Sequence, residues 1–513
     1  MATEKSNRAT GLLAAIERIG NRVPDITILF IGAFVLVCAI SAVMSTMSFG
    51  YINPATGKQV EIINMLSGAS LVDLMSKMVS NYAGFPPLAM VIVATLGIGI
   101  AEGSGYLNVA LRKMLLITPK RLISPMVILV GMLSHIGPDS GYVIIIPIAA
   151  YMFYASGRHP LAGVAASFAG IAGAFAANYT PSAIDPIIQG FTQAAAQIVR
   201  PDYMVNVLCN YYFMFWATFL VIPACWYITD RIVEPWLWKM YPMNEALDIE
   251  DSSTPITKRE NTAFYIATSI LVIMGVGLAL LVMPADSPLR APDGTLHSFQ
   301  APIMRSIVTL IFIFAGAVGL AYGVASGNFR SPKDFTKSME DITRTLISLI
   351  VFYFFAAQFL YAFNASQLGA LIAVSGAEFL KSLAMPPQLT IGGCILFVGL
   401  LNLLITSASA KWAILAPIFV PMLMGVGIAP ELTQAAFRVS DSAVNVVTPM
   451  FAFYPLIITY CQKYVKESGI GTLSSMMLPY TIGLLIALTA VLYAMWFLDV
   501  PLGIQATYTL QGF

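Results

Sequence analysis

Long apolar runs recur along the whole chain, and polar loops separate them. A helix needs about 20 mainly apolar residues to cross the hydrocarbon core of a membrane. The runs that have this length without a polar interruption are 26–48, 86–110, 205–229, 262–283, 301–325, 342–364 and 475–498. The pattern therefore predicts an all-α membrane protein that crosses the bilayer many times.

The remaining apolar stretches are too long for one crossing and carry polar or helix-breaking residues near their middles. Residues 121–156 contain SHIGPDSG and residues 388–426 contain ITSASAKW, and each has room for two half-length helices around a polar tip. We interpret these two stretches as re-entrant hairpins. Residues 161–198 contain NYTPSAIDP and residues 430–461 contain RVSDSAVNVVTP, and in both proline predicts a break within one crossing. Unpaired backbone at that depth is tolerated only where protein or a water-filled cavity covers it, so these breaks indicate a site.

The chain contains an internal repeat. Residues 139–160 align with 409–430 without a gap, so that prolines and a glycine coincide: Pro147 with Pro417, Gly157 with Gly427, and Pro160 with Pro430. Between the two hairpins lie the crossings at 161–198, 205–229, 262–283, 301–325 and 342–364. Because this number is odd, the second hairpin must enter from the opposite face, and the repeat is predicted to be inverted. Inverted repeats with discontinuous helices are typical of secondary transporters.

The predicted organisation has a first repeat unit, a connecting region and an inverted second unit. These cover residues 1–230, residues 231–300 with a cytoplasmic loop and a linking helix, and residues 301–513. Lysine and arginine concentrate in alternate loops, which by the positive-inside rule lie in the cytoplasm. We expect nine transmembrane helices plus two re-entrant hairpins, with the N-terminus cytoplasmic and the C-terminus periplasmic.

Composition and charge agree with a membrane protein and exclude several other classes. Of the 513 residues 58% are hydrophobic and only 10% are charged, whereas soluble domains carry about 25% charged residues. The net charge of +1 argues against a nucleic-acid partner. The five cysteines lie in apolar stretches without CxxC spacing, and no GxxxxGK[ST] motif for ATP is present. We expect no enzymatic activity and no cofactor, so uphill transport would need an ion gradient.

The polar residues of the second broken helix form the strongest candidate site. They are Arg438, Asp441, Ser442, Asn445 and Thr448, followed by Pro449. An ionisable side chain at the centre of a membrane helix costs about 2.5–3.5 kcal/mol, so it indicates function. Arg438 and Asp441 have i,i+3 spacing and are expected to pair. The alternative is an ion pair that only holds helices together.

Asp185 is the corresponding residue of the first broken helix, within NYTPSAIDP. A carboxylate beside unwound backbone suits a proton or sodium site. It could equally cap the helix that follows, and the two roles are compatible.

The hairpin tips supply further polar groups. Those of the first tip are Ser134, His135, Asp139 and Ser140; those of the second are Asn402, Thr406, Ser407, Ser409, Lys411 and Trp412. Helix N-termini at such tips favour carboxylates. Trp412 could stack on an aromatic ligand or serve in packing, and His135 and Lys411 could simply face water. Glu102 is expected to cap a break at Gly103-Ser104-Gly105.

At the Ser409–Lys411–Trp412 tip, the Pro430 to Pro449 segment and NYTPSAIDP, the sequence resembles the AbgT family of p-aminobenzoyl-glutamate transporters over nearly the whole chain. The resemblance implies a homodimer in the bacterial inner membrane. It implies transport of p-aminobenzoyl-glutamate, p-aminobenzoate and sulfonamide antimetabolites, driven by protons or sodium. Carried over by motif, the residues implied to matter are Asp185, Asn402, Ser409, Trp412, Pro430, Arg438, Asp441 and Pro449.

Three functional hypotheses follow. The first is an ion-coupled secondary transporter that exports sulfonamides and p-aminobenzoate-like small aromatic carboxylates, with Asp185 and Asp441 as ion-linked carboxylates. The second is a sodium-coupled importer of p-aminobenzoyl-glutamate or another dicarboxylate, with sodium near Asp185, Asn402 and Asp441. The third is a channel whose hairpins form a filter, which the occluded character of half-buried unwound helices disfavours.

Overall fold

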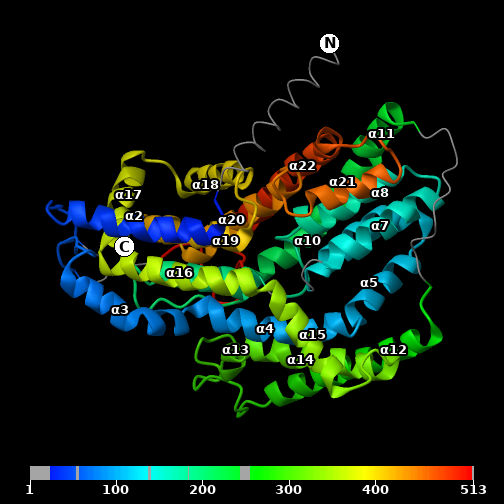
Figure 1. The fold of residues 1–513 in the computed structure, drawn as a ribbon, viewed down its shortest axis with the longest axis horizontal. Helices are drawn as coiled ribbons and strands as arrows, with labels where there is room; N and C mark the ends of the chain where they lie inside the picture. The colour runs from blue at the N-terminus through cyan, green and yellow to red at the C-terminus, as the bar shows by residue number, and fades with distance from the viewer. Residues whose placement is uncertain (1–23, 53–56, 137–139, 183, 243–254, 511–513) are drawn as a thin grey trace.

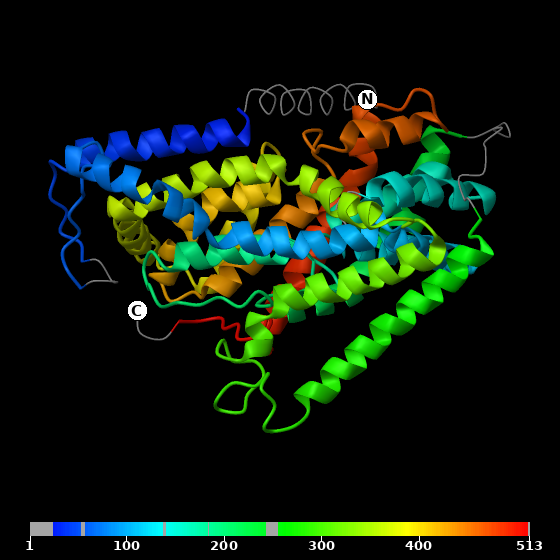
Figure 2. The same ribbon diagram turned by 60° about the horizontal axis from the view of Figure 1, so that its bottom comes forward.

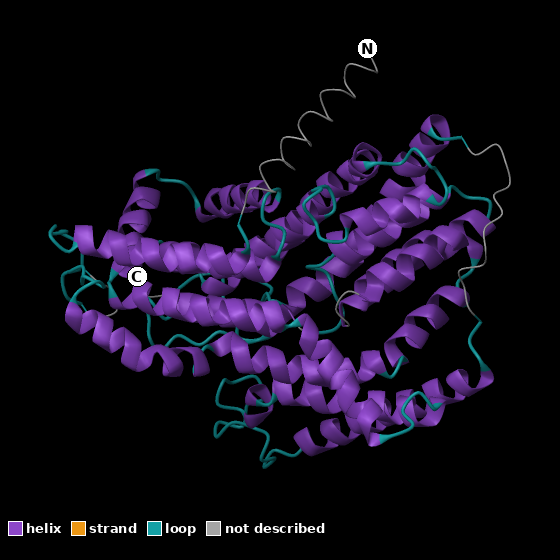
Figure 3. Cartoon of the chain, viewed as in Figure 1, coloured by secondary structure: helices purple, strands orange, loops and turns teal. Residues whose placement is uncertain are grey.

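The protein is a helical bundle in the described part of the chain. The computed structural model describes residues 24–52, 57–136, 140–182, 184–242 and 255–510. In these residues the regular elements are helices, and β-pairing is limited to two isolated bridges, Ile52 with Gln59 and Ile428 with Thr509 (Figure 3). The fold is therefore all-α, as the apolar pattern predicts.

The first half of the described chain begins with long helices and continues with shorter ones (Figure 1). They are α2 (Ile26–Met44), α3 (Gly68–Ala83), α4 (Pro86–Gly103), α5 (Tyr106–Leu116), α6 (Ile123–Leu133), α7 (Ser140–Ala155), α8 (Pro160–Phe168), α9 (Ile184–Ala196), α10 (Tyr211–Ile228) and α11 (Glu234–Met240). Short 3₁₀ turns, Lys120–Leu122 and Ser134–Ile136, flank α6. Single π turns follow α8 (Ala169–Gly173) and α10 (Thr229–Val233).

The second half of the described chain begins with the long helix α12. The helices are α12 (Lys258–Val282), α13 (Pro302–Arg305), α14 (Ile307–Ser326), α15 (Pro332–Thr345), α16 (Ile347–Ala365), α17 (Leu368–Ser382), α18 (Pro387–Asn402), α19 (Ala408–Met424), α20 (Pro430–Asn445), α21 (Tyr454–Gln462) and α22 (Ile470–Phe497). Two helix pairs are sharply bent, by 116° between α5 and the segment Lys120–Leu133 and by 118° between α17 and α18.

Much of the surface is suited to lipid. Within the described residues, seven helices are long and apolar enough to cross a membrane, or up to nine if each bent pair counts as one span. Helix α12 lies along the edge of the molecule (Figure 2), and only 6% of its apolar window is buried. Its exposed side chains include Val272, Ile273 and Leu281. An apolar surface of this extent indicates contact with the bilayer.

The structure confirms the predicted interruptions of the long apolar stretches. The stretch 121–156 divides into α6 and α7, and 388–426 into α18 and α19. The stretch 161–198 is interrupted over the described residues 174–182, and 430–461 over residues 446–453. The count of nine crossings with two hairpins, the inverted relation of the halves and the unit boundaries stay predictions.

Several helices differ from the expectation. The run 86–110 is not one span: α4 ends at Gly103, and Gly105 has a φ of 89°, a left-handed conformation that glycine adopts without strain. This is the break expected at Gly103-Ser104-Gly105. Helices α3, α5, α15 and α17 were not predicted, because their polar residues lower the mean hydropathy of each segment.

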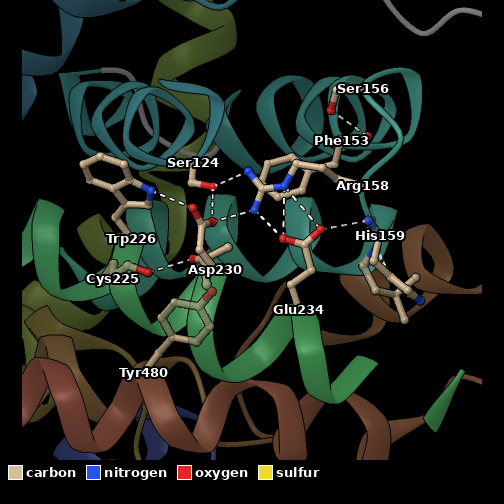
Figure 4. A network of polar contacts seen from close by, with 12 residues as sticks. Ser124, Phe153, Ser156, Arg158, His159, Cys225, Trp226, Asp230, Glu234 and Tyr480 are labelled. Carbon is tan, nitrogen blue, oxygen red and sulfur yellow. Dashed lines mark hydrogen bonds and ion pairs between the residues drawn. The ribbon is translucent and has the colours of Figure 1, made fainter. Parts of the chain in front are cut away.

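A partly buried network of polar contacts joins several segments of the first half (Figure 4). Arg158, between α7 and α8, forms ion pairs with Asp230, in the π turn after α10, and with Glu234, the first residue of α11. Its Nη1 also donates to Ser124 Oγ at 2.7 Å, and Trp226 donates to Asp230 at 2.7 Å. Since one guanidinium joins three segments, this region is expected to move as one body.

Candidate functional site

Helix α20 lies in the interior of the protein and carries a polar stripe along its length. All of its residues are buried. Its apolar residues, such as Leu432, Ala436 and Val439, belong to one core cluster, whereas Phe437 belongs to the other. The polar stripe consists of Glu431, Gln434, Arg438, Asp441 and Asn445, spaced by three and four residues. Residues with this spacing share one helix face.

Arg438 joins the two halves of the molecule. Its Nη2 lies 2.7 Å from Oδ1 of Asp185 at the start of α9, and both side chains are at least 95% buried. The other carboxylate oxygen of Asp185 accepts hydrogen bonds from the backbone N–H of Ser182 at 2.7 Å and from its hydroxyl at 3.2 Å. Asp185 therefore has the capping role that was predicted for it, and its other oxygen pairs with Arg438, whereas a proton or sodium site at this carboxylate stays a prediction.

The guanidinium of Arg438 retains capacity for a ligand. Its Nη1 contacts only the thioether of Met214, at 3.3 Å, and its Nε has no hydrogen-bond partner among the described residues. Buried donors are nearly always satisfied, and an unsatisfied one costs about 1–3 kcal/mol. A carboxylate that binds two guanidinium N–H groups would remove this cost.

Asp441 belongs to a separate cluster, at the tip between α18 and α19. Its Oδ1 lies 2.7 Å from Nζ of Lys411, and both side chains are at least 98% buried. Asn402 donates to the backbone oxygen of Asp441 at 2.9 Å and to the side chain of Asn445 at 3.0 Å, while its own oxygen accepts from Lys411. Four polar side chains from three helices are thus linked to one another by hydrogen bonds and one ion pair.

Two predictions about these charges are wrong. Arg438 and Asp441 do not pair with each other, because each has a closer partner on another helix: Asp185 for Arg438 and Lys411 for Asp441. Lys411 does not face water, since only 1% of its side chain is exposed. Local i,i+3 spacing identifies neighbours on one helix but not partners that come from other helices.

Trp412 is packed inside the protein in this conformation. Its indole N–H donates to the hydroxyl of Thr192 at 2.8 Å, and its ring centroid lies 4.4 Å from that of Phe437 at an interplanar angle of 30°. Thr192 in turn donates to Gln434 at 2.6 Å. The packing role considered for Trp412 is therefore visible, and a contact with the ring of a ligand stays a prediction.

The remaining predicted residues shape the helix ends. Ser409 lies in the first turn of α19, where its hydroxyl is 3.3 Å from that of the N-cap Ser407. Pro430 is the first residue of α20, a position at which proline loses no hydrogen bond. Pro449 lies in the break after α20, where the hydroxyl of Thr448 donates to Leu403 O at 2.9 Å. That bond connects the break to the tip of the second hairpin.

A cavity of about 270 Å³ lies beside the tip of the first hairpin and the start of α9. Its lining includes Ser134, His135, Tyr142 and Phe175, together with Ile184 next to Asp185. The imidazole Nε2 of His135 contacts the backbone oxygen of Ile171. Asp139 lies outside the described residues, as does the side chain of Ser140. The volume is near the lower end of small-molecule sites, about 300–1,000 Å³.

Sequence reasoning missed Glu431 and Gln434 and did not assign a charge partner to Lys411. The first two could have been found by extending the stripe of Arg438, Asp441 and Asn445 backwards at helical spacing. When such a helix is wholly buried, its polar side chains must find their hydrogen-bond partners inside the protein.

Comparison with known proteins agrees with this arrangement of broken helices. The model of the AbgT putative transporter family matches residues 11–510. The chain belongs to the AbgT family. Within it, the chain is 33% identical over 499 residues to the p-aminobenzoyl-glutamate transport protein of Escherichia coli K12, a match that covers 97% of each chain.

Solved structures of AbgT-family transporters have the same fold. The YdaH transporter of Alcanivorax borkumensis matches with a TM-score of 0.89 and 37% identity, over 94% of this chain and 100% of that one. MtrF of Neisseria gonorrhoeae, described as illuminating a class of antimetabolite efflux pumps, matches with a TM-score of 0.89 and 38% identity, over 97% and 100%. This AbgT-family chain is a multi-pass membrane protein with a transport function rather than an enzymatic one.

In this AbgT-family chain, the side chains that the sequence suggests for ion binding have protein partners. Both aspartates face cationic side chains, and the oxygen of Asn402 is held by Lys411. No group of three or more His, Cys, Asp or Glu residues that could hold a metal ion occurs in the described part of the chain. A sodium ion near Asp441 and Asn402 would therefore require Lys411 to move.

Proposed function

We propose that this protein is an ion-gradient-driven secondary transporter that exports p-aminobenzoyl-glutamate, p-aminobenzoate and sulfonamide-type antimetabolites by alternating access. The observation that carries the proposal is the buried pair of Arg438 and Asp185, which joins α20 to α9 and leaves the guanidinium Nε without a hydrogen-bond partner among the described residues. The family relationship supplies the substrate class, since one relative is a p-aminobenzoyl-glutamate transport protein and another represents antimetabolite efflux pumps.

An exchange of partners at Arg438 would couple substrate to ion. A substrate carboxylate has the geometry to bind the guanidinium bidentately and can replace Asp185. The released Asp185 would then be a buried carboxylate without a cation, which is unfavourable unless it takes up a proton or sodium. Substrate and ion would therefore bind together or in exchange, which is the requirement for coupled transport. Asp441, held by Lys411, is the second carboxylate that could respond in this way.

The second candidate function is sodium-coupled import of p-aminobenzoyl-glutamate or another dicarboxylate. The name of the Escherichia coli relative favours this substrate. Import and export use the same alternating site, so the geometry does not separate them. We further propose that the protein acts as a homodimer in the bacterial inner membrane, with a cytoplasmic N-terminus and a periplasmic C-terminus.

Purified protein in liposomes tests the proposal. Flux of labelled p-aminobenzoyl-glutamate, p-aminobenzoate and a sulfonamide would be followed under an imposed proton gradient, an imposed sodium gradient and neither. The proposal expects accumulation against the substrate gradient with one of the two ions. Flux that ignores both ion gradients would contradict coupled transport and favour a channel.

A further inference from the structure

Glu431 is a buried carboxylate that differs from the two aspartates of the site. Its side chain lies in the first turn of α20, and the residue is only 1% exposed. Both carboxylate oxygens lie 3.0 Å from the hydroxyl of Tyr203. Among the described residues no lysine, arginine or histidine forms an ion pair with it, whereas Asp185 and Asp441 each have one.

A surface cavity reaches the other side of Tyr203. This cavity has a volume of about 580 Å³ and is lined by Tyr203 together with Arg200, Asp499 and residues 506–510. Asp499 and Thr507 are exposed, so the cavity is open at the surface. Tyr203 thus links a surface cavity to a buried carboxyl group, an arrangement that suits a proton relay.

Hydrogen bonds connect Glu431 inward to the candidate site. The side-chain amide of Asn210 donates to the backbone oxygen of Glu431 at 2.9 Å and accepts from Gln434 at 2.8 Å. Gln434 also accepts from Thr192, which holds the indole of Trp412. A change at Glu431 would therefore be transmitted to the helix face that carries Arg438.

We propose that Glu431 is a proton-binding residue of the transport cycle, loaded from the surface cavity through Tyr203. As the hydroxyl proton of Tyr203 passes to the carboxylate of Glu431, the hydroxyl takes a proton from hydronium in the cavity, so that water is left there and Tyr203 returns to its starting state. A buried carboxyl group without a cation is far less costly when it is protonated than when it is charged. The site is separate from Asp185 and Asp441, and the inference rests on the gradient-driven transport proposed above.

Other titratable groups lie around Glu431. Tyr203 contacts it directly, and both Tyr203 and the thiol of Cys209 interact electrostatically with it. Arg200, Asp499 and Tyr508 line the cavity, and Asp185 and Arg438 lie further along the interior. Arg438 is paired with Asp185 and does not form an ion pair with Glu431. Tyr203 connects the buried carboxyl group of Glu431 to the cavity.

The test compares net transport with exchange in proteoliposomes. Glu431→Gln keeps the size of the side chain and a hydrogen-bond acceptor for Tyr203 but cannot carry a proton. We expect net flux of labelled p-aminobenzoyl-glutamate driven by a proton gradient to fall at least about tenfold, while exchange of labelled for unlabelled substrate at equal pH persists. Tyr203→Phe, which removes only the relay hydroxyl, should slow net flux and spare exchange. Glu467→Gln, at an exposed loop carboxylate, is the matched control.

The outcomes separate this inference from the proposed function. Proton-driven net flux that is unchanged in Glu431→Gln and Tyr203→Phe would overturn the inference and leave coupled transport intact. Coupling of the wild-type protein to sodium alone would have the same consequence. Wild-type flux that ignores both gradients would contradict both proposals. Equal loss of exchange and net flux in folded Glu431→Gln would show a role in binding or structure instead.

Discussion

At the scale of residues, charges inside this protein are balanced between helices rather than along one helix. Lys411 on α19 and Asp441 on α20 are almost completely buried and lie 2.7 Å apart. Removing one partner of a buried ion pair leaves an uncompensated charge and costs about 3–5 kcal/mol, whereas removing both is often nearly neutral. The pair therefore allows stability to be separated from transport.

We expect Asp441→Ala and Lys411→Met each to abolish transport and to lower the thermal unfolding temperature of the membrane-embedded protein. The double variant Lys411→Met/Asp441→Ala should recover most of the stability, because no unpaired charge remains, but not the transport. Thermal unfolding in detergent and substrate flux in liposomes would be measured on the same preparations. Normal flux in the double variant would assign the pair to helix packing alone.

The sequence predicts which residues of α20 are important but not what they contact. Arg438, Asp441 and Asp185 are recognisable because each is charged within an apolar stretch that proline interrupts. Their partners are not recognisable, since the pair of Arg438 with Asp185 joins residues far apart in sequence. Glu431 was overlooked because it directly follows Pro430, where an acidic residue suggests an ordinary helix start.

At the scale of elements, close helix approach depends on glycine. Helices α4 and α14 pack against each other, and a Cβ atom at Gly319 would lie 2.5 Å from the backbone N of Ala101. Hydropathy predicts both helices but not this contact. It also misses α3, α5, α15 and α17, whose polar faces make each segment less apolar than a membrane span.

Gly319→Val should therefore force α14 away from α4 and destabilise the protein by about 1–3 kcal/mol. Gly277→Val on α12 is the matched control, because no atom lies within 4 Å of its added Cβ. The comparison is made by thermal unfolding of the purified proteins. If the two variants unfold at the same temperature, the close packing of α4 on α14 does not contribute to stability as described.

At the scale of the whole molecule, one sharp bend occurs just before each of the two predicted hairpins. The odd number of spans between the hairpins predicts that the halves are inverted.

Lys120 precedes the first hairpin and Ser382 the second, and both are exposed. Lys120→Cys should react with a membrane-impermeant thiol reagent only from the cytoplasmic side, and Ser382→Cys only from the periplasmic side. Reaction of both from one side would exclude the inverted arrangement.

The ion pair of Arg438 with Asp185 connects the two halves of the chain. The proposed coupling of substrate to ion depends on this pair. The most direct test is flux of labelled p-aminobenzoyl-glutamate into liposomes that contain Arg438→Ala, compared with the wild-type protein. Arg344→Ala serves as control, because that arginine is 73% exposed and its ion-pair distance is 3.9 Å. We predict that Arg438→Ala is inserted and folded but transports nothing, while Arg344→Ala transports normally. Wild-type flux by folded Arg438→Ala would contradict a transport site at this pair.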